Sequence, residues 1–302
     1  MPEIGTNFSD VILSGGTGRS GTTIIGKLLS RHSQIGLSRP SEIKMLTSGN
    51  GLLDLHLGRK VGRYRKLMVN DRLHLERFRQ RLFHDWWERE PKVGELAGLI
   101  QGIEREELED LYISLKRDWK QEKSTAPCKF LRAFIDSQKL RSGKLFWIDT
   151  TPVNLFRALD LADFLPGAHF IHMVRDGRDV ISSVIREPWG PSTYEDGLDW
   201  YRNRMIRILT NAKVLKDRVL TISLEELALN NRDETLARVL AFLNLPSEPK
   251  LQLYFQSEVS PEKVRQGRWK NEVADMAKFN ESYFRIVAEL REIDPSVPLA
   301  SS

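Results

Sequence analysis

The sequence of 302 residues contains a single cysteine, Cys128. One cysteine cannot form a disulfide within the chain, and it cannot build a zinc site from cysteine ligands. No apolar stretch approaches the length that spans a membrane. The first seven residues have no basic region followed by an apolar run, so they do not match a secretion signal. These absences predict a soluble protein of the cytoplasm with no transmembrane segment.

The chain also lacks a strong charge of either sign. Its 46 Lys and Arg against 41 Asp and Glu give a formal net charge of +5. This balance favours an anionic ligand but is small for a nucleic-acid-binding protein. The excess is local, because residues 58–90 hold ten Lys and Arg against five Asp and Glu. Two interpretations fit this block: a solvated helix face, or a basic rim for an acceptor or cofactor.

A glycine-rich segment is the most informative feature that is present. Residues 11–23 read VILSGGTGRSGTT and nearly match the phosphate-binding pattern G-x-x-x-x-G-K-[ST]. Gly16 and Gly21 have the required spacing, and Thr23 fills the final hydroxyl position. Thr22 stands where the pattern has the lysine that reaches the β- and γ-phosphates of a nucleoside triphosphate. The segment therefore predicts a loop that binds a phosphate without transferring a γ-phosphoryl group.

The residues around this loop predict a strand, a turn and a helix. Val11–Leu13 is a short apolar run typical of a buried parallel strand. Glycines after it allow the tight backbone that turns amide groups inward. A helical pattern begins at Thr22, and the free amides and dipole of a helix N-terminus attract anions.

Strands and helices alternate along the rest of the chain, which predicts an α/β protein with a mainly parallel sheet in a three-layer arrangement. We expect one domain over residues 1–302, with a mostly helical insertion on the acceptor side at residues 52–143. Residues 36–51 are expected to form a loop. Thr151 is expected to cap a helix whose first residue is Pro152. Further strands are predicted at 144–149, 168–174 and 218–222, and further helices at 180–185, 195–214 and within 224–243.

Four separate segments, in this order along the chain, together resemble the sulfotransferases that use 3′-phosphoadenosine 5′-phosphosulfate (PAPS), nearer the tyrosylprotein and broad bacterial branches than the cytosolic steroid and phenol enzymes. The resemblance covers residues 11 to about 270, without the helical insertion. The segments are Gly18-Arg19-Ser20-Gly21-Thr22-Thr23, Asp149-Thr150-Thr151-Pro152-Val153-Asn154, Val174–Ser183 and Gly267-Arg268-Trp269.

The resemblance implies two anion sites at opposite ends of one adenosine. The loop residues Gly18, Arg19, Ser20, Gly21, Thr22 and Thr23 would bind the 5′-phosphosulfate. Arg175 at a strand end and Ser183 two helical turns later would bind the 3′-phosphate, and an arginine fork suits a phosphate. Arg265, Gly267, Arg268 and Trp269 would complete that site, and the compressed spacing of this segment leaves open which arginine contacts the phosphate. Arg178 and Asp179 are predicted to be structural.

The catalytic base is predicted to be Glu42, because the tyrosylprotein enzymes use a glutamate shortly after the loop helix. A surface glutamate is the alternative interpretation, and His32, His56, His74 and His84 are other candidate bases. His169 and His172 are expected in the core. Thr150 replaces a lysine that many relatives use at the leaving oxygen, so Arg19 or Lys44 would take that role. Asp149 would orient a nearby donor, and no metal would be required.

The predicted reaction is attack of an acceptor hydroxyl, or of an amine, on the sulfur of PAPS, with loss of the 3′,5′-bisphosphate PAP. A kinase-like phosphotransferase using ATP and magnesium is the second interpretation, and Thr22 weakens it. A non-catalytic nucleotide- or RNA-binding protein is the third, supported by aromatic side chains in the basic block. These aromatic residues are more often core residues than a stacking platform. No nucleic-acid partner is expected, and the acceptor stays open between a small molecule, a glycan, a lipid and a peptide.

Overall fold

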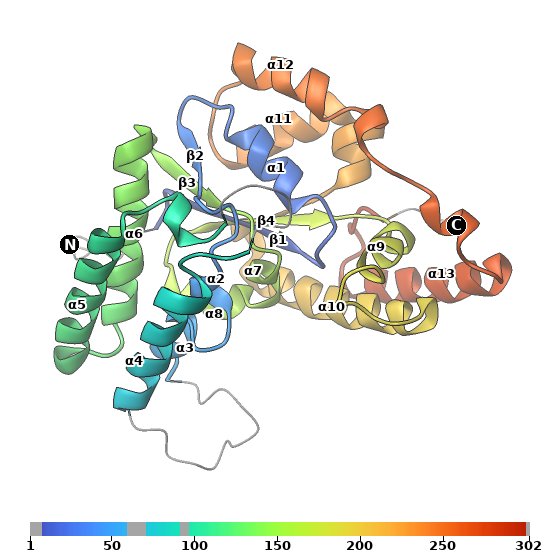
Figure 1. The fold of residues 1–302 in the computed structure, drawn as a ribbon. Coiled ribbons are helices and arrows are strands. Elements are labelled where there is room, and N and C mark those ends of the chain that lie inside the picture. The colour runs from blue at the N-terminus through green and yellow to red at the C-terminus, as the bar shows by residue number, and fades with distance from the viewer. Residues whose placement is uncertain (1–7, 59–70, 91–96, 300–302) are drawn as a thin grey trace. The chain divides into compact units, whose positions relative to one another are not determined.

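A computed structural model describes residues 8–58, 71–90 and 97–299, and its main element is a five-stranded sheet with the strand order β2-β3-β1-β4-β5 (Figure 1). Strand β2 pairs in parallel with β3, and Ile35 lies opposite Phe146. Strand β4 pairs in parallel with β5, and Phe170 lies opposite Val219. Helices flank the sheet, so the predicted α/β class with a mainly parallel sheet is confirmed. The strands are β1 Val11–Gly16, β2 Ile35–Leu37, β3 Phe146–Asp149, β4 His169–Val174 and β5 Val219–Ser223.

The described chain divides into two compact units, which we describe separately. The first comprises the described parts of residues 1–12, 34–151 and 160–168. Its helices are α2 Lys44–Thr47, α3 Leu52–His56, α4 Asp71–Gln80, α5 Arg105–Gln121, α6 Ala126–Ser142 and most of α8 Ala158–Phe164, with a π-helical turn at Arg81–Asp85 and a 3-10 turn at Leu99–Gln101. Most described residues between 52 and 143 are helical, apart from non-helical stretches such as the one around the β-bridge between Arg89 and Ala97; residues 59–70 and 91–96 lie outside the described part. The single-domain organisation stays a prediction.

Buried aromatic side chains and one ion-pair cluster hold the first unit together. Phe78 is fully buried and meets Phe130 edge to face, with ring centroids 5.7 Å apart. Arg132 on α6 donates two hydrogen bonds to Asp10, at 2.9 and 3.0 Å. Burial alone would raise the pKa of Asp10, but hydrogen bonds from Arg132 and Lys139 outweigh it and lower the pKa. The start of β1 is thereby fixed to α6.

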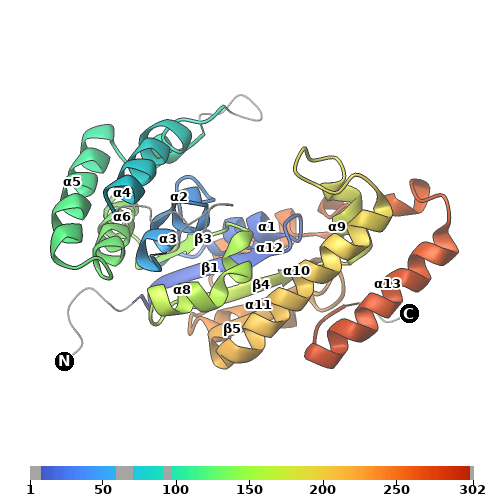
Figure 2. The same cartoon turned by 90° about the horizontal axis from the view of Figure 1, so that it is seen from below.

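The second unit comprises residues 13–33, 152–159 and the described part of 169–302. Helices α9, α10 and α13 lie side by side in both views, and α1 packs against α12 (Figures 1 and 2). The helices are α1 Thr22–Leu29, α7 Val153–Phe156, α9 Gly177–Val184, α10 Tyr194–Leu215, α11 Arg232–Phe242, α12 Pro249–Glu258 and α13 Met276–Ile293. A π-helical turn spans Glu226–Asn230, and 3-10 turns span Lys216–Arg218, Pro261–Lys263 and Arg268–Asn271.

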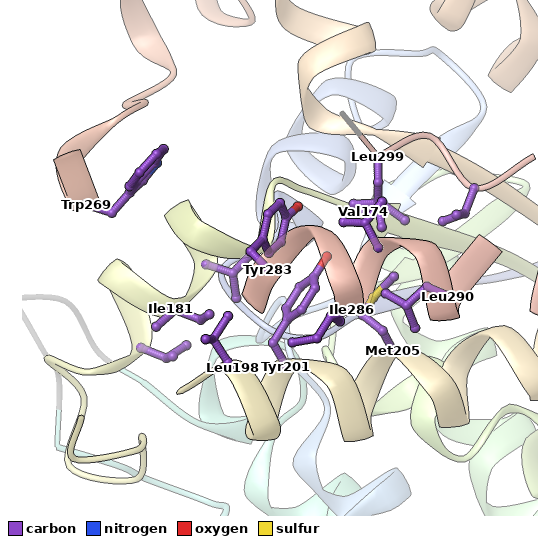
Figure 3. Close-up of a cluster of buried hydrophobic side chains, with 14 of the residues drawn as sticks. Val174, Ile181, Leu198, Tyr201, Met205, Trp269, Tyr283, Ile286, Leu290 and Leu299 are labelled. Carbon is purple, nitrogen blue, oxygen red and sulfur yellow. The ribbon is translucent and has the colours of Figure 1, made fainter. Parts of the chain in front are cut away.

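A hydrophobic cluster fixes α9, α10 and α13 to the end of β4 (Figure 3). Tyr201 and Tyr283 are both fully buried in it, with ring centroids 6.4 Å apart. Figure 3 shows their hydroxyl groups pointing to the same side. Each hydroxyl has a backbone partner just after β4: Tyr201 donates to the carbonyl of Arg175, and Tyr283 accepts from the amide of Gly177, both at 3.1 Å. Aromatic packing therefore sets the backbone on which the candidate site is built.

The sequence prediction was wrong at three places. Residues 36–51 were expected to be a loop, but they contain most of β2 and the short helix α2. The helix after Thr151 begins one residue later than expected, because Pro152 is its N-cap and Val153 its first residue. Helix α9 begins at Gly177, three residues before the start expected at residue 180. Within the described residues, no helix is both long and apolar enough to cross a membrane.

Candidate functional site

The phosphate loop follows β1 and has an unusual backbone. Gly18, Arg19 and Gly21 have positive φ values of 90°, 58° and 100°. Residues with positive φ in a tight turn direct amide groups toward one side, as in an anion-binding nest. A β-carbon on Gly16 would lie 2.4 Å from the carbonyl oxygen of Met173, so this position requires glycine. The loop therefore has the close packing and the backbone that the sequence predicted.

Neighbouring segments hold the loop in place. The amide of Gly16 donates to the carbonyl of Pro152 at 3.0 Å, and the side-chain amide of Asn154 donates to the carbonyl of Ser14 at 3.1 Å. Arg204 on α10 lies 3.5 Å from the carbonyl oxygen of Thr17, a contact that no sequence pattern indicated. The hydroxyl of Ser20 is buried, and no described residue forms a hydrogen bond with it. A buried polar atom without a partner costs free energy, which suits a loop that gains its last hydrogen bonds from a ligand.

Arg175, at the end of β4, brings three segments together. Its guanidinium donates to the carbonyl of Arg19 in the loop at 3.1 Å and to the carbonyl of Arg265. Its Nε is buried and has no hydrogen-bond partner among the described residues. Ligands collect at the carboxyl ends of the strands in open α/β sheets, and Arg175 occupies such a position. The three segments predicted to bind PAPS through Arg19, Arg175 and Arg265 therefore meet within the second unit.

Arg19 and Ser183 also meet. Arg19 Nε donates to Ser183 Oγ at 2.8 Å, and its Nη1 lies 3.8 Å from Glu187 Oε1. Arg19 was predicted to bind the 5′ end of the ligand and Ser183 the 3′ end. These two residues, predicted to bind opposite ends of one ligand, are therefore in direct contact.

The start of α9 is stabilised by contacts that need no ligand. Asp176 caps the helix by accepting from the amide of Arg178 at 2.9 Å, and its carboxylate also pairs with the Arg178 guanidinium. Asp179 accepts from the amide of Gly267 at 2.8 Å. Burial raises the pKa of Asp179, although the charge of Arg175 opposes this shift. Arg178 and Asp179 thus have the structural contacts predicted for them, and Asp176 pairs with Arg178 rather than with Arg175.

The segment from Arg265 to Glu272 packs on α9 and α13. Trp269 is buried, with Arg178 over its ring at 4.4 Å. The side chains of Arg265 and Arg268 are exposed. Glu272 accepts from Ser182 Oγ at 2.9 Å and also from Tyr194 and Arg186. No sequence pattern indicated Glu272, because its donors lie 78 or more residues before it, on and after α9 and on α10.

Glu42 belongs to the first unit, where the backbone around it is fixed by β3. Asp149 Oδ1 accepts from the amide of Ile43 at 2.8 Å and from Thr151 Oγ1 at 3.0 Å. Thr150 Oγ1 donates to the carbonyl of Ser41 at 2.8 Å. Asp149 thus orients donors, as predicted, and Thr150, which replaces the expected lysine, holds the segment that carries Glu42.

The histidines considered as bases have other surroundings. His32 is fully buried and lies 3.1 Å from the carbonyl oxygen of Pro246. His56 lies 2.9 Å from the carbonyl oxygen of Ser124. His172 is fully buried, and burial lowers its pKa to about 3, so it stays neutral in the core as predicted. His74 is buried and His84 is exposed; both belong to the first unit.

The aromatic residues of the basic block are mostly core residues. Phe78, Phe83 and Trp86 are at most 9% exposed, so their faces are covered by protein and are not a stacking platform for bases. In the part of the chain that the structure describes, no cluster of three or more His, Cys, Asp or Glu residues could hold a metal ion.

Comparison with known proteins gives the family. The model of a family described as the sulfotransferase family matches residues 12–249. Among solved structures, sulfotransferase STF9 from Mycobacterium avium is similar with a TM-score of 0.54 and 12% identity, covering 99% of this chain and 80% of that one. The sulfotransferase domain of the olefin synthase from Synechococcus PCC 7002 is similar with a TM-score of 0.51 and 19% identity, covering 92% of each chain. No curated protein matches. Because the family model spans most of the sequence and the fold agrees, the chain belongs to the sulfotransferase family.

Proposed function

We propose that this protein transfers the sulfuryl group of PAPS to an acceptor hydroxyl and releases PAP. The observation that carries the proposal is the convergence of Arg19, Arg175, Ser183 and the Arg265 segment in one unit. PAPS has a 5′-phosphosulfate and a separate 3′-phosphate, so it requires cations and amides at two points. A single triphosphate requires a loop lysine instead, and this chain has Thr22 there.

The residues fit both ends of such a ligand. The amides of Gly18, Ser20 and Gly21 and the unpaired hydroxyl of Ser20 suit the 5′ end. The unpaired Nε of Arg175 and the hydroxyl of Ser183 suit the 3′-phosphate, because arginine donates paired hydrogen bonds to phosphate oxygens. Exposed Arg265 and Arg268 add positive charge near that end.

In the proposed reaction the acceptor hydroxyl gives its proton to Glu42 and attacks sulfur in line. PAPS supplies the activated sulfuryl group. Arg19 and the loop amides stabilise the negative charge that grows on the leaving 5′-phosphate. Arg19 reaches the 3′ end through Ser183, so we expect it to bind the donor at both ends.

Thermal unfolding with candidate ligands tests the proposal. PAP without metal should raise the unfolding temperature, and at a hundred times its Kd it should add about 2.7 kcal/mol of stability. Adenosine 5′-phosphate should stabilise less, because it lacks the 3′-phosphate. Stabilisation by ATP only with magnesium would favour the phosphotransferase instead. Stabilisation by RNA alone, with steep salt dependence, would favour a nucleic-acid-binding protein.

A further inference from the structure

The loop that joins α9 to α10 is a fixed turn rather than a loose connection. The amide of Glu187 donates to the carbonyl of Val184, and the amide of Gly190 donates to the carbonyl of Glu187, both at 2.9 Å. A β-carbon on Gly190 would lie 1.8 Å from the carbonyl oxygen of Val184, so the turn forms only with glycine there. The turn therefore holds Glu187 and Trp189 in defined positions.

This turn lies against the phosphate loop at two points. A β-carbon on Gly18 would lie 3.8 Å from Cη2 of Trp189, which places the indole ring beside the loop backbone. Glu187 Oε1 lies 3.8 Å from Nη1 of Arg19, the next residue of the loop. Both contacts are within the second unit. The ring thus borders the place where the proposed reaction would occur.

The ring of Trp189 also lies next to a second tryptophan ring. It lies 6.3 Å from the ring of Trp200, with an angle of 36° between the planes. The Arg204 guanidinium lies over Trp200 at 4.4 Å and contacts the carbonyl of Thr17 in the loop. Two tryptophans and an arginine therefore form a layered support that joins α10, the turn and the loop.

Trp189 is nevertheless 53% exposed. Among the large hydrophobic side chains that are exposed in the described residues, it is the one aromatic ring. An indole kept in contact with water forgoes about 25 cal/mol for each Å² of apolar surface left unburied. Rigid aromatic rings that stay partly exposed beside a reactive site are typical of ligand recognition.

We propose that Trp189 is the acceptor-side platform of the site and that it stacks against a hydroxylated six-membered ring. The apolar face of such a ring covers the indole, while its hydroxyl extends over Gly18 toward the loop. A phenol and a sugar share this chemistry of a flat or nearly flat apolar face with a hydroxyl at its edge. This inference rests on the proposed sulfuryl transfer and narrows its acceptor from any hydroxyl compound to a ring alcohol.

The test measures binding to the protein saturated with PAP, by saturation-transfer NMR and titration. The probes are 2-naphthol for phenols, methyl β-glucopyranoside for sugars and 1-hexanol as an alcohol without a ring. We expect at least one ring probe to bind, and we expect W189A to weaken that probe about 10-fold, the loss of one stacked ring. W189F should restore most of the affinity. Binding of 1-hexanol should be the same in all variants, and which ring probe binds separates phenol from sugar.

Controls separate this inference from the proposed function. Leu253→Ala removes an exposed side chain of the same unit, 69% exposed on α12, and should leave every probe unchanged. W189A should keep the PAP affinity of the wild type. Failure of the wild type to bind PAP would reject the proposed function itself. If PAP binds, the platform is overturned when neither ring probe binds, when W189A leaves ring binding unchanged, or when W189A weakens PAP as much as the ring probe.

Discussion

Arg175 combines two tasks in one side chain. Two of its nitrogens hold the carbonyls of Arg19 and Arg265, and its buried Nε has no partner. A guanidinium that is already oriented loses little freedom when a phosphate arrives, so its contribution to binding should be large. If Arg175 were only structural, its removal would lower the affinity for ligands with and without a 3′-phosphate equally. Comparing two such ligands therefore tests its role.

We therefore predict that Arg175→Ala weakens PAP binding by about 10- to 100-fold, the range expected for losing charge-assisted hydrogen bonds. Adenosine 5′-phosphate should lose much less affinity, because it has no group for Arg175 to bind. Isothermal titration with both ligands measures the ratio. Arg285→Ala is the matched control, since this exposed arginine pairs with Glu281 one turn earlier on α13. Equal losses for the two ligands would make Arg175 a structural residue.

Glu42 gives the second prediction at this scale. Glu42→Gln should leave PAP affinity nearly unchanged and lower turnover by about 10²- to 10⁴-fold, the usual contribution of a general base. Glutamine keeps the size of the side chain but cannot take the proton. Glu106→Gln, an exposed glutamate of the same unit, is the control and should keep full turnover. Retained turnover in Glu42→Gln would pass the role of base to another residue, such as a histidine.

At the scale of elements, the segment Arg265–Glu272 depends on contacts made far away in the sequence. Glu272 receives donors from Ser182 and Arg186 on and after α9 and from Tyr194 on α10. Asp179 holds the amide of Gly267. The segment that carries Arg265 and Arg268 is thus attached to α9 through Gly267 and to α9 and α10 through Glu272. We infer that Glu272 positions this segment without touching the ligand.

Glu272→Ala should therefore speed PAP dissociation about 10-fold, because three donors lose their acceptor and each hydrogen bond to a charged group is worth roughly 1.5–3 kcal/mol before relaxation. Stopped-flow displacement of PAP measures the rate. Glu281→Ala removes an exposed carboxylate of α13 and is the control. Adenosine 5′-phosphate should dissociate at the wild-type rate. If it also dissociates faster, Glu272 would support the whole unit rather than the 3′-phosphate segment.

Local sequence signals predicted some elements and missed others for a physical reason. β1, β4 and the loop between Gly16 and Thr23 were predictable, because an apolar run, glycines at fixed spacing and a helical pattern are all local. Ile35–Leu37 is only three residues long and contains Gly36, so no local pattern marks it as a strand. Its pairing with Phe146–Ile148 forms it, and that partner is more than a hundred residues away.

At the scale of the whole molecule, the fold class and the family followed from the order of the segments, but the site's detail did not. The contact between Arg19 and Ser183 joins residues 164 positions apart. Glu272 and Trp189 likewise make their contacts with distant segments, Glu272 with Ser182 and Trp189 with the loop at Gly18. A motif specifies which residue types are present, whereas tertiary packing decides which of them meet. The pH dependence of the folding stability also belongs to this scale, and we expect the buried His172 to contribute to it.

His172 lies in the centre of β4, fully buried, with its Nδ1 3.3 Å from Thr221 Oγ1. Burial lowers its pKa from 6.5 to about 3. Above pH 6.5 the side chain is neutral in both the folded and the unfolded chain. Between pH 6.5 and 3 the unfolded chain binds a proton that the folded chain does not, so the stability falls as the pH falls. One proton corresponds to a slope of about 1.4 kcal/mol for each pH unit.

We therefore predict that His172→Gln flattens the fall of the unfolding free energy below pH 6.5 by up to about 1.4 kcal/mol per pH unit. Glutamine retains a polar group for Thr221 and has no proton to bind in this range. Urea unfolding at a series of pH values measures how the unfolding free energy of each protein changes with pH. A difference in stability between the two proteins at pH 7 does not affect this comparison of slopes. The ring resonances of His172 in the folded protein should also stay constant from pH 8 to 5. A titration of these resonances near pH 6.5, or equal slopes in the two proteins, would show that His172 is not the group that couples folding to acid.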